Sequence, residues 1–180
     1  MFAERGYAAT TIDEICAAVP TSKRTFFRYF ADKEALVFPN RRGRLARFQE
    51  LLAAVRPDQS PFDVFRTVTS LFAAEYTENR EQLLAQQRLI AQSPELLARE
   101  REIDSDWERE IAASFVRRMP PGESGPWLAD VLAGAVMGTV RATMRHWYAD
   151  DGQADLESLG LEAIDYLERG FVFSRQEPDA

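Results

Sequence analysis

Apolar residues recur along this chain of 180 residues at the three- and four-residue spacing of amphipathic helices, whereas the period-two alternation of strands is nearly absent. Phe65, Val68 and Phe72, for example, fall on one face of a helix. Proline and glycine clusters cut the pattern into helix-length segments. The helices expected from it span residues 11–18, 22–30, 33–55, 62–78, 81–92, 95–119, 127–149 and 156–173. The pattern therefore predicts an all-α protein, with short helices ahead of a bundle of longer ones.

The first two of these helices have recognisable end signals. Thr11 and Glu14 stand at capping-box spacing at the start of the first helix. Val19 has to leave helical geometry because Pro20 follows it, and Ser22 can cap the second helix through its hydroxyl. Two short helices joined by such a turn are the minimal helix-turn-helix unit, in which the second helix enters the major groove of DNA.

The second helix carries side chains that suit contact with DNA. Lys23 and Arg24 can donate hydrogen bonds to guanine O6 and N7, and Thr25 offers a hydroxyl and a methyl group. Phe27 and Tyr29 face outward, toward groove walls and phosphates. Basic residues on a short helix are, however, more often only a solvated surface, and helix-turn-helix geometry also occurs in proteins that bind no DNA. The pattern by itself leaves both interpretations open.

The charge of the chain becomes informative when it is divided along the sequence. The net charge of −7 argues by itself against a nucleic-acid partner, because phosphates attract basic surfaces. Residues 1–47, however, hold nine basic and five acidic side chains, so this part carries +4 and the remainder carries −11. The basic part of the chain therefore coincides with the helix-turn-helix unit.

Composition disfavours several kinds of site and location. Cys16 is the only cysteine and His146 the only histidine, which excludes a disulfide framework, a cysteine-rich zinc site and a pair of histidines on a metal. We therefore expect no metal and no cofactor. The longest uncharged apolar stretch, 131–140, is about half as long as a membrane span, and the first residues lack the apolar core of a signal peptide. We expect a cytoplasmic protein without membrane contact.

From Phe2 to Phe38 the chain reads FAERGYAATTIDEICAAVPTSKRTFFRYFADKEALVF. Its Phe-Ala-Glu-Arg-Gly-Tyr start, paired threonines, two isoleucines, aromatic run and Lys-Glu-x-Leu end resemble, in order and spacing, the DNA-binding domain of the tetracycline-repressor (TetR) family of bacterial transcription regulators. The resemblance implies a DNA-binding domain over residues 1–38 and a larger helical domain for ligand binding and dimerisation over residues 39–180. It also implies a homodimer that binds a pseudo-palindromic operator in double-stranded DNA and is released by a small molecule.

The resemblance assigns roles to individual residues of the first domain. The matching residues are Lys23, Arg24 and Thr25 at base-reading positions, Thr11, Phe27, Tyr29 and Lys33 at phosphate-contacting positions, and Ser22 at the cap of the recognition helix. Pro20 stands where the family usually has glycine, and because proline cannot adopt a positive φ the turn has to be built differently. Phe27 replaces a tyrosine, which removes one hydroxyl donor. Met1 falls near the end of the family's first helix, so we expect that helix to be truncated.

The remaining sequence is predicted to hold the ligand and the dimer interface. The stretch from 87 to 96 and the string Arg-Thr-Phe-Phe-Arg-Tyr-Phe resemble a subgroup of actinobacterial TetR-like regulators, whose C-terminal domain is associated with acyl-coenzyme A-like ligands. The resemblance implies an apolar small-molecule effector and points to acyl-CoA. The candidate ligand residues are Phe65, Phe72, Arg88, Trp107, Phe115, Arg141 and Arg145. The candidate dimer residues are Trp127, Gly134, Gly138, Leu159, Ile164, Leu167 and Phe171. Aromatic and small residues in such helices also serve as ordinary core, so packing within one protomer stays open for both sets.

The leading hypothesis is a ligand-responsive transcriptional repressor, in which the ligand favours a conformation whose recognition helices no longer match the operator. Two alternatives stay open: a helical dimer that binds ligand but not DNA, which a truncated first helix would favour, and an enzyme that acts on an acyl ligand. No nucleophile–base pair at recognisable spacing supports an enzyme, and a single histidine argues against a catalytic relay. We therefore expect a regulator and not an enzyme.

Overall fold

The computed structural model describes residues 1–180 except 40, 55, 57–58, 118–124 and 171–180. The described part of the chain is helical and contains no strand, so the prediction of an all-α fold is confirmed. Its elements are α1 (Phe2–Arg5), α2 (Ile12–Ala18), α3 (Lys23–Tyr29), the 3-10 turn η1 (Glu34–Leu36), α4 (Arg41–Ala53), α5 (Pro61–Glu78), α6 (Arg80–Ala91), α7 (Pro94–Val116), α8 (Gly125–Ala149) and α9 (Leu156–Arg169).

The prediction of one continuous helix over residues 33–55 is wrong. The carboxylate of Asp32 accepts a hydrogen bond of 2.8 Å from the Ala35 amide, but it opens only the short turn η1. Pro39 follows Phe38, and the residue before a proline is disfavoured in helical geometry. The chain therefore leaves the helix there, and α4 starts afresh at Arg41.

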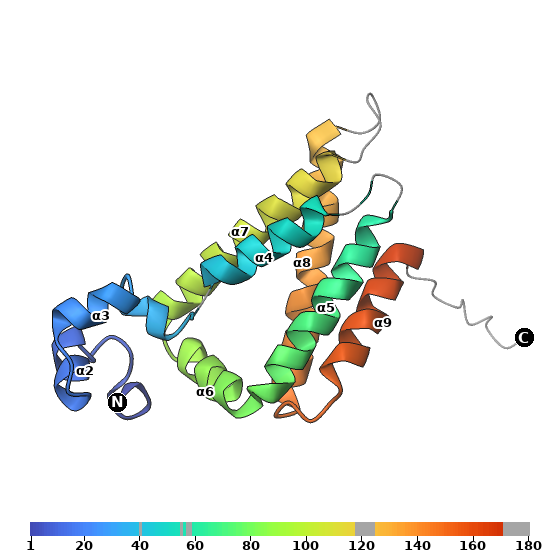
Figure 1. Cartoon of the computed structure of the whole chain (residues 1–180). Coiled ribbons are helices and arrows are strands. Elements are labelled where there is room, and N and C mark those ends of the chain that lie inside the picture. Colours follow the sequence, from blue (N-terminus) through green and yellow to red (C-terminus); the bar gives the residue numbers. More distant parts are fainter. Residues whose placement is uncertain (40, 55, 57–58, 118–124, 171–180) are drawn as a thin grey trace, which may run out of the picture.

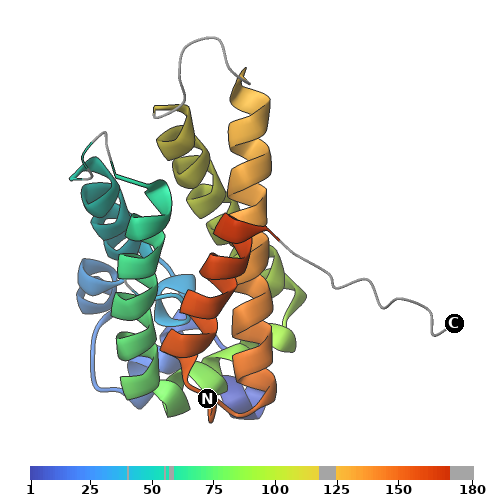
Figure 2. The same ribbon diagram turned by 90° about the vertical axis from the view of Figure 1, so that its right-hand side faces the viewer.

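The helices form a small unit and a larger body (Figures 1 and 2). α2 and α3 pack on each other at one end of the molecule, beside the N-terminus. The body is built on α5, α8 and α9, which pack side by side, while α4 and α7 run together along α5 and α8. α6 joins α5 to α7 at the end of the body that faces the small unit. Among the described residues, no helix has the length and apolar character that a membrane span needs.

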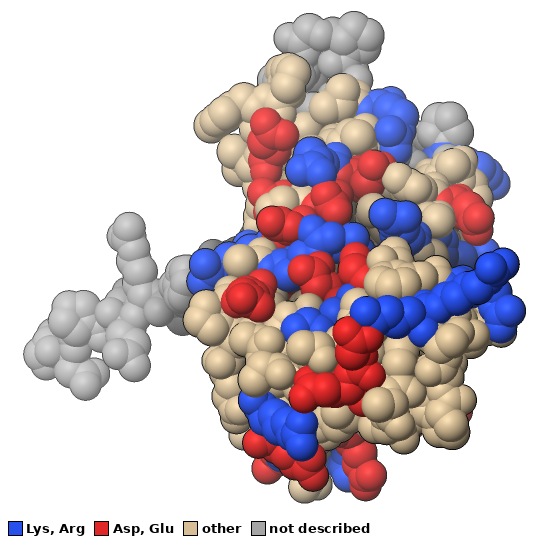
Figure 3. All heavy atoms as spheres, turned by 90° about the vertical axis from the view of Figure 1, so that its left-hand side faces the viewer, with Lys and Arg blue, Asp and Glu red and all other residues tan. Residues whose placement is uncertain are grey.

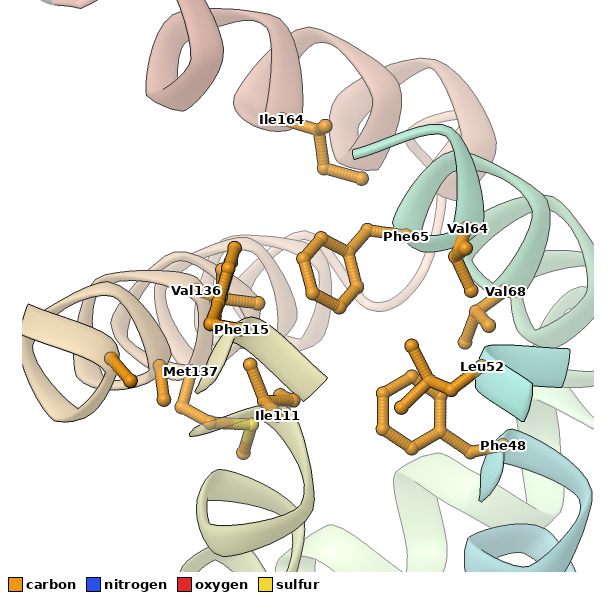
Figure 4. Close-up of a cluster of buried hydrophobic side chains, with 12 residues drawn as sticks. Phe48, Leu52, Val64, Phe65, Val68, Ile111, Phe115, Val136, Met137 and Ile164 are labelled. Atoms are coloured by element: carbon orange, nitrogen blue, oxygen red, sulfur yellow. The ribbon is translucent and has the colours of Figure 1, made fainter. Parts of the chain in front are cut away.

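The main core lies between α4, α5, α7, α8 and α9, and Figure 4 shows its side chains converging from all five helices. Phe65 is its centre: its ring lies 5.8 Å from that of Phe115 and 6.4 Å from that of Phe48, measured between centroids. The buried rings of Phe48, Phe65 and Phe115 stabilise this core because each removes a large apolar area from water. This core and a smaller cluster of Ala73, Trp147 and Leu156 together explain the amphipathic pattern of the body.

Glycine is required at two places in the body. In the turn between α8 and α9, Gly152 has φ +66°, and a Cβ there would lie 2.9 Å from the Trp147 ring. On α9, a Cβ at Gly160 would lie 2.5 Å from Cγ2 of Thr69 on α5. Such a distance is shorter than any real carbon–carbon contact, so Gly160 lets α5 and α9 approach closely enough to close the core.

Candidate DNA-binding and ligand sites

Local signals build the helix-turn-helix unit. Thr11 caps α2: its hydroxyl accepts from the Glu14 amide at 3.2 Å, and the Glu14 carboxylate accepts from the Thr11 amide at 2.8 Å. Ser22 caps α3 by accepting from the Thr25 amide at 3.1 Å. Both caps agree with the sequence prediction. The turn at Val19 and Pro20 contains no residue with positive φ. This chain therefore forms the turn between the two helices without the glycine that is usual there.

The recognition helix α3 divides into a buried and an exposed face. Phe26 is buried and packs on Phe30, with ring centroids 5.3 Å apart. Phe27 and Tyr29 are 51% and 69% exposed, which is unusual for large aromatic side chains. Their exposure matches the prediction that they face outward, and it leaves two aromatic side chains free to pack against a groove wall.

The basic groups of this unit are partly neutralised by nearby acids. Lys23 pairs with Asp13 on α2 at 2.7 Å, and Arg5 pairs with Glu14 at 3.1 Å. Arg24 is exposed and makes no ion pair within the described residues. The end view in Figure 3 accordingly shows basic and acidic side chains mixed over this face. Lys23 would have to break its ion pair with Asp13 before it could contact DNA, whereas Arg24 has no such ion pair to break.

Lys33 serves an internal contact. Its ammonium donates to the carbonyl oxygens of Tyr7 at 2.8 Å and Thr10 at 3.0 Å, and lies 4.1 Å from the centre of the Tyr7 ring. Burial and the nearby carboxylates of Glu34 and Asp32 raise the pKa of Tyr7 to about 12, so its phenol stays neutral. With two of its three N–H groups used, Lys33 has at most one left for a phosphate.

Three kinds of contact join the small unit to the body. The side-chain amide of Gln86 on α6 donates to the carbonyl oxygen of Val37 at 2.6 Å. Arg99 on α7 forms an ion pair with Glu34, with Nε 2.9 Å from Oε2. An apolar cluster spans the same junction; its buried members are Tyr7, Val37, Ile90 and Leu96. These contacts connect α6 and the start of α7 directly to the helix-turn-helix unit.

A cavity of about 670 Å³ lies inside the body, within the range of small-molecule sites. It is lined by residues of α4 to α9, opens to the surface, and reaches Phe38 and Pro39 at the junction with the small unit. Most of its lining is apolar. Five of the seven predicted ligand residues line it, namely Phe65, Phe72, Trp107, Arg141 and Arg145.

The other two predicted ligand residues lie elsewhere. Arg88 is an exposed surface residue and pairs with Asp151 at 3.2 Å. Phe115 is buried in the core against Phe62 and Phe65 and is not part of the cavity wall. The sequence pattern places both on helices that do line the cavity, but it does not determine which face each one occupies.

Polar groups from four helices meet in the cavity wall. Arg44 on α4 pairs with Glu75 at 2.5 Å and lies over the Tyr76 ring, 5.1 Å from its centre. Tyr148 on α8 lies close enough to Arg44 and Glu100 for their charges to affect the pKa of its phenol. Burial raises the pKa of the Tyr76 and Tyr148 phenols, so both remain neutral hydrogen-bonding groups.

Two carboxylates one turn apart on α7 also face this cavity. Burial raises the pKa of Glu100 above its ordinary range, and Asp104 adds to the rise. Burial likewise raises the pKa of Asp104, although Arg141, 3.6 Å away, partly offsets it. Arg44, Glu100 and Tyr148 are not recognisable as cavity residues from the sequence, because an Arg or Glu in a charged helix gives no signal of the cavity it faces.

Some of the predicted dimer residues are exposed, whereas others are part of the protomer's own core. Trp127 is 75% exposed on α8, where Val131 is also exposed. Beyond its own stretch of helix, a Cβ at Gly138 would meet no atom of the described residues within 4 Å. Gly134 lies on the same helix and Leu159 is half-buried on α9. Ile164 and Leu167 instead pack in the protomer's own core. Phe171 lies outside the described residues.

Comparison with known proteins identifies both parts of the chain. Residues 1–38 match the profile of bacterial regulatory proteins of the tetR family, and residues 59–172 match the profile of the MftR C-terminal domain. MftR of Mycobacterium tuberculosis, named as a transcriptional regulator of mycofactocin biosynthesis, is 29% identical over 94% of this chain and 85% of its own. TcmR of Streptomyces glaucescens, an HTH-type transcriptional regulator, is 26% identical over 100% of this chain and 83% of its own.

Solved structures share the fold at low identity. FadR of Bacillus subtilis, crystallised with stearoyl-CoA, superimposes with a TM-score of 0.64 at 18% identity and covers 95% of this chain and 94% of its own. FadR of Thermus thermophilus, crystallised with lauroyl-CoA, gives a TM-score of 0.54 at 22% identity and covers 99% of this chain and 94% of its own. The family profiles, the helix-turn-helix unit and the all-α body together show that this chain is a transcriptional regulator of the TetR family with an MftR-type C-terminal domain.

Proposed function

We propose that this protein is a ligand-responsive repressor, which binds a palindromic operator as a homodimer and releases it when an apolar ligand fills the cavity of the body. The observation that carries the proposal is the position of the cavity. Its wall includes Phe38, Pro39 and Gln86, and Gln86 is hydrogen-bonded to the helix-turn-helix unit. A ligand that changes this wall therefore acts directly on the junction.

The exposed side of α3 supports operator binding. Arg24 is exposed and unpaired within the described residues, Lys23 stands at the start of the helix, and Thr25 lies beside them. These are groups that read base edges from the N-terminal end of a recognition helix. Thr11 and Ser22 use their hydroxyls as helix caps, so their part in DNA contact is to position the backbone amides of α2 and α3.

The ligand class that fits the cavity best is a long acyl chain on a phosphate-bearing carrier such as coenzyme A. The apolar wall suits a hydrocarbon chain. Arg41, Arg101 and Arg145 lie where the wall meets the surface, and guanidinium groups bind phosphate well. The FadR structures with stearoyl-CoA and lauroyl-CoA show that the same fold holds such ligands in other proteins.

A homodimer through α8 and α9 is supported by the exposed apolar side chains there. Trp127 and Val131 on α8 and Tyr166 on α9 expose about half or more of their surface. Replacing Trp127 by Glu is expected to shift the protein from dimer to monomer in analytical ultracentrifugation, whereas Val116→Glu, at the end of α7, should leave the dimer intact. A dimer of unchanged stability in Trp127→Glu would place the interface elsewhere.

Operator binding is tested with the full chain and the intergenic DNA upstream of its own coding sequence. A repressor is expected to prefer this DNA over random duplex of equal length at moderate salt, with affinity falling as salt rises because counterions are released from phosphate. Equal affinity for both duplexes would contradict the proposal, and a dimer that binds acyl-CoA but not this DNA would favour a ligand-binding protein without DNA recognition.

A further inference from the structure

Arg44 lines the cavity and has one buried hydrogen-bonding group that the described part of the protein does not satisfy. Arg44 has five N–H groups on its guanidinium. Nη2 donates to Glu75 at 2.5 Å, and Nη1 reaches the Tyr76 hydroxyl only at the long distance of 3.4 Å. Its Nε is buried and has no hydrogen-bond partner among the described residues. A buried donor without an acceptor is costly, so this arrangement favours a ligand that supplies one.

The groups around Arg44 define the chemistry of such a ligand. Tyr148 lines the same cavity from α8 and keeps its phenolic proton, so it is a second donor. Glu75 already occupies one edge of the guanidinium, which leaves little net positive charge for a second full anion. Two hydrogen-bond donors whose positive charge is largely balanced by Glu75 suit a neutral carbonyl oxygen, because its two lone pairs can accept both hydrogen bonds.

We propose that Arg44, with Tyr148 beside it, receives the carbonyl oxygen of a chain-like ligand and so makes the cavity selective for acyl chains over alkyl chains. The proposal rests on the function given above, because it requires that an apolar ligand enters the cavity. It goes beyond that function by assigning the recognition of the carbonyl group to one residue of α4.

The position of Arg44 gives this contact a second consequence. Arg44 stands in the first turn of α4, directly after the Pro39 break that separates this helix from the helix-turn-helix unit. Because its Nε is closed off from solvent, the side chain has to turn to offer this donor to a ligand. Turning weakens the pair with Glu75, which is the charged link between the start of α4 and α5. Ligand recognition by Arg44 therefore weakens this link between α4 and α5.

The test compares two ligands that differ in one group. Lauroyl-CoA carries a thioester carbonyl, whereas S-dodecyl-CoA has the same chain and carrier joined by a thioether. Isothermal titration calorimetry of the full wild-type chain is expected to show lauroyl-CoA binding roughly ten- to a hundredfold more tightly, the range for a hydrogen bond to a charged donor. Arg44→Gln should reduce that ratio to near one by weakening lauroyl-CoA binding alone.

Two further variants make the result specific. Arg44→Lys keeps the charge and the pair with Glu75 but lacks Nε, so it too should lose most of the preference; it replaces Arg44→Gln if that variant does not fold by circular dichroism. Arg88→Gln removes an exposed arginine outside the cavity and should keep the wild-type ratio. Equal binding of the two ligands by wild type, or an unchanged ratio in both Arg44 variants, would overturn the inference while leaving the proposed function in place. If neither ligand binds, the proposed ligand class fails and the inference with it.

Discussion

The side-chain amide of Gln86 donates a 2.6 Å hydrogen bond to the backbone carbonyl oxygen of Val37, and the same side chain forms part of the cavity wall. Val37 closes the turn η1 at the end of the helix-turn-helix unit. One residue thus touches the cavity and the DNA-binding unit at once, so a change in the cavity wall has a direct physical route to that unit.

Replacing Gln86 by Leu is expected to weaken this coupling. The variant should still bind operator and ligand, but the factor by which ligand lowers operator affinity should fall about two- to thirtyfold, the range for residues that carry coupling energy. Fluorescence anisotropy of labelled operator, with and without saturating lauroyl-CoA, measures the factor. Gln87→Leu is the matched control, because Gln87 lines the cavity without a bond to Val37. Equal factors in both variants would remove Gln86 from the coupling route.

Removing the Arg24 side chain should cost specific operator binding. Arg24→Ala is expected to weaken binding to the preferred duplex by ~1–3 kcal/mol while changing binding to random DNA much less. Competition titrations at fixed salt measure both affinities. Arg109→Ala, which removes an exposed arginine paired with Asp106 on α7, should change neither. A uniform loss on both duplexes would show that Arg24 contacts phosphate and not a base.

Two glycines on neighbouring helices should respond in opposite ways to substitution by alanine. At Gly160 the new methyl group meets Thr69, so Gly160→Ala is expected to lower the free energy of unfolding by ~1–3 kcal/mol through overpacking. At Gly138 an added Cβ would meet no atom of the described residues within 4 Å beyond its own stretch of helix, so the better helix propensity of alanine should raise the free energy of unfolding by ~0.5–1 kcal/mol. Urea denaturation decides between these signs. Loss of dimer stability in Gly138→Ala would instead show a partner helix packed at this glycine.

The stability contribution of Glu100 should depend on pH. Burial raises its pKa in the folded chain, so the charged form is penalised at pH values above the folded pKa, and the penalty disappears below the unfolded value of about 4.5. Glu100→Gln is therefore expected to raise the melting temperature at neutral pH and to give no gain near pH 4. Thermal unfolding followed by circular dichroism at both pH values tests this. A gain that persists at acid pH would point to packing and not to charge.

The sequence predicted those features that depend on neighbouring residues. The caps at Thr11 and Ser22 and the outward aromatics of α3 follow from local spacing, and the structure has them. The break at Pro39 was also present in the sequence, but the helical pattern on both sides concealed it. Local physical rules therefore predict the recognition unit well, and they fail where two strong local signals compete.

Features that depend on distant contacts could not be predicted in the same way. Lys33 is basic and stands at a position where the family contacts phosphate, yet its ammonium binds two carbonyl oxygens more than twenty residues away in sequence. Ile164 belongs to an amphipathic helix with two possible partners, and only the packed body shows that it faces the protomer's own core. Arg44 has no apolar context in sequence, and only the fold brings it to the cavity.

Release of DNA when the cavity is filled can be measured in a single titration. Lauroyl-CoA is added to the complex of the full wild-type chain with its upstream DNA, and the apparent affinity for the duplex is measured at constant salt by fluorescence anisotropy. Saturating ligand is expected to weaken DNA binding by about fivefold or more, the lower end of ordinary allosteric coupling. Tight binding of lauroyl-CoA with unchanged affinity for the DNA would contradict it.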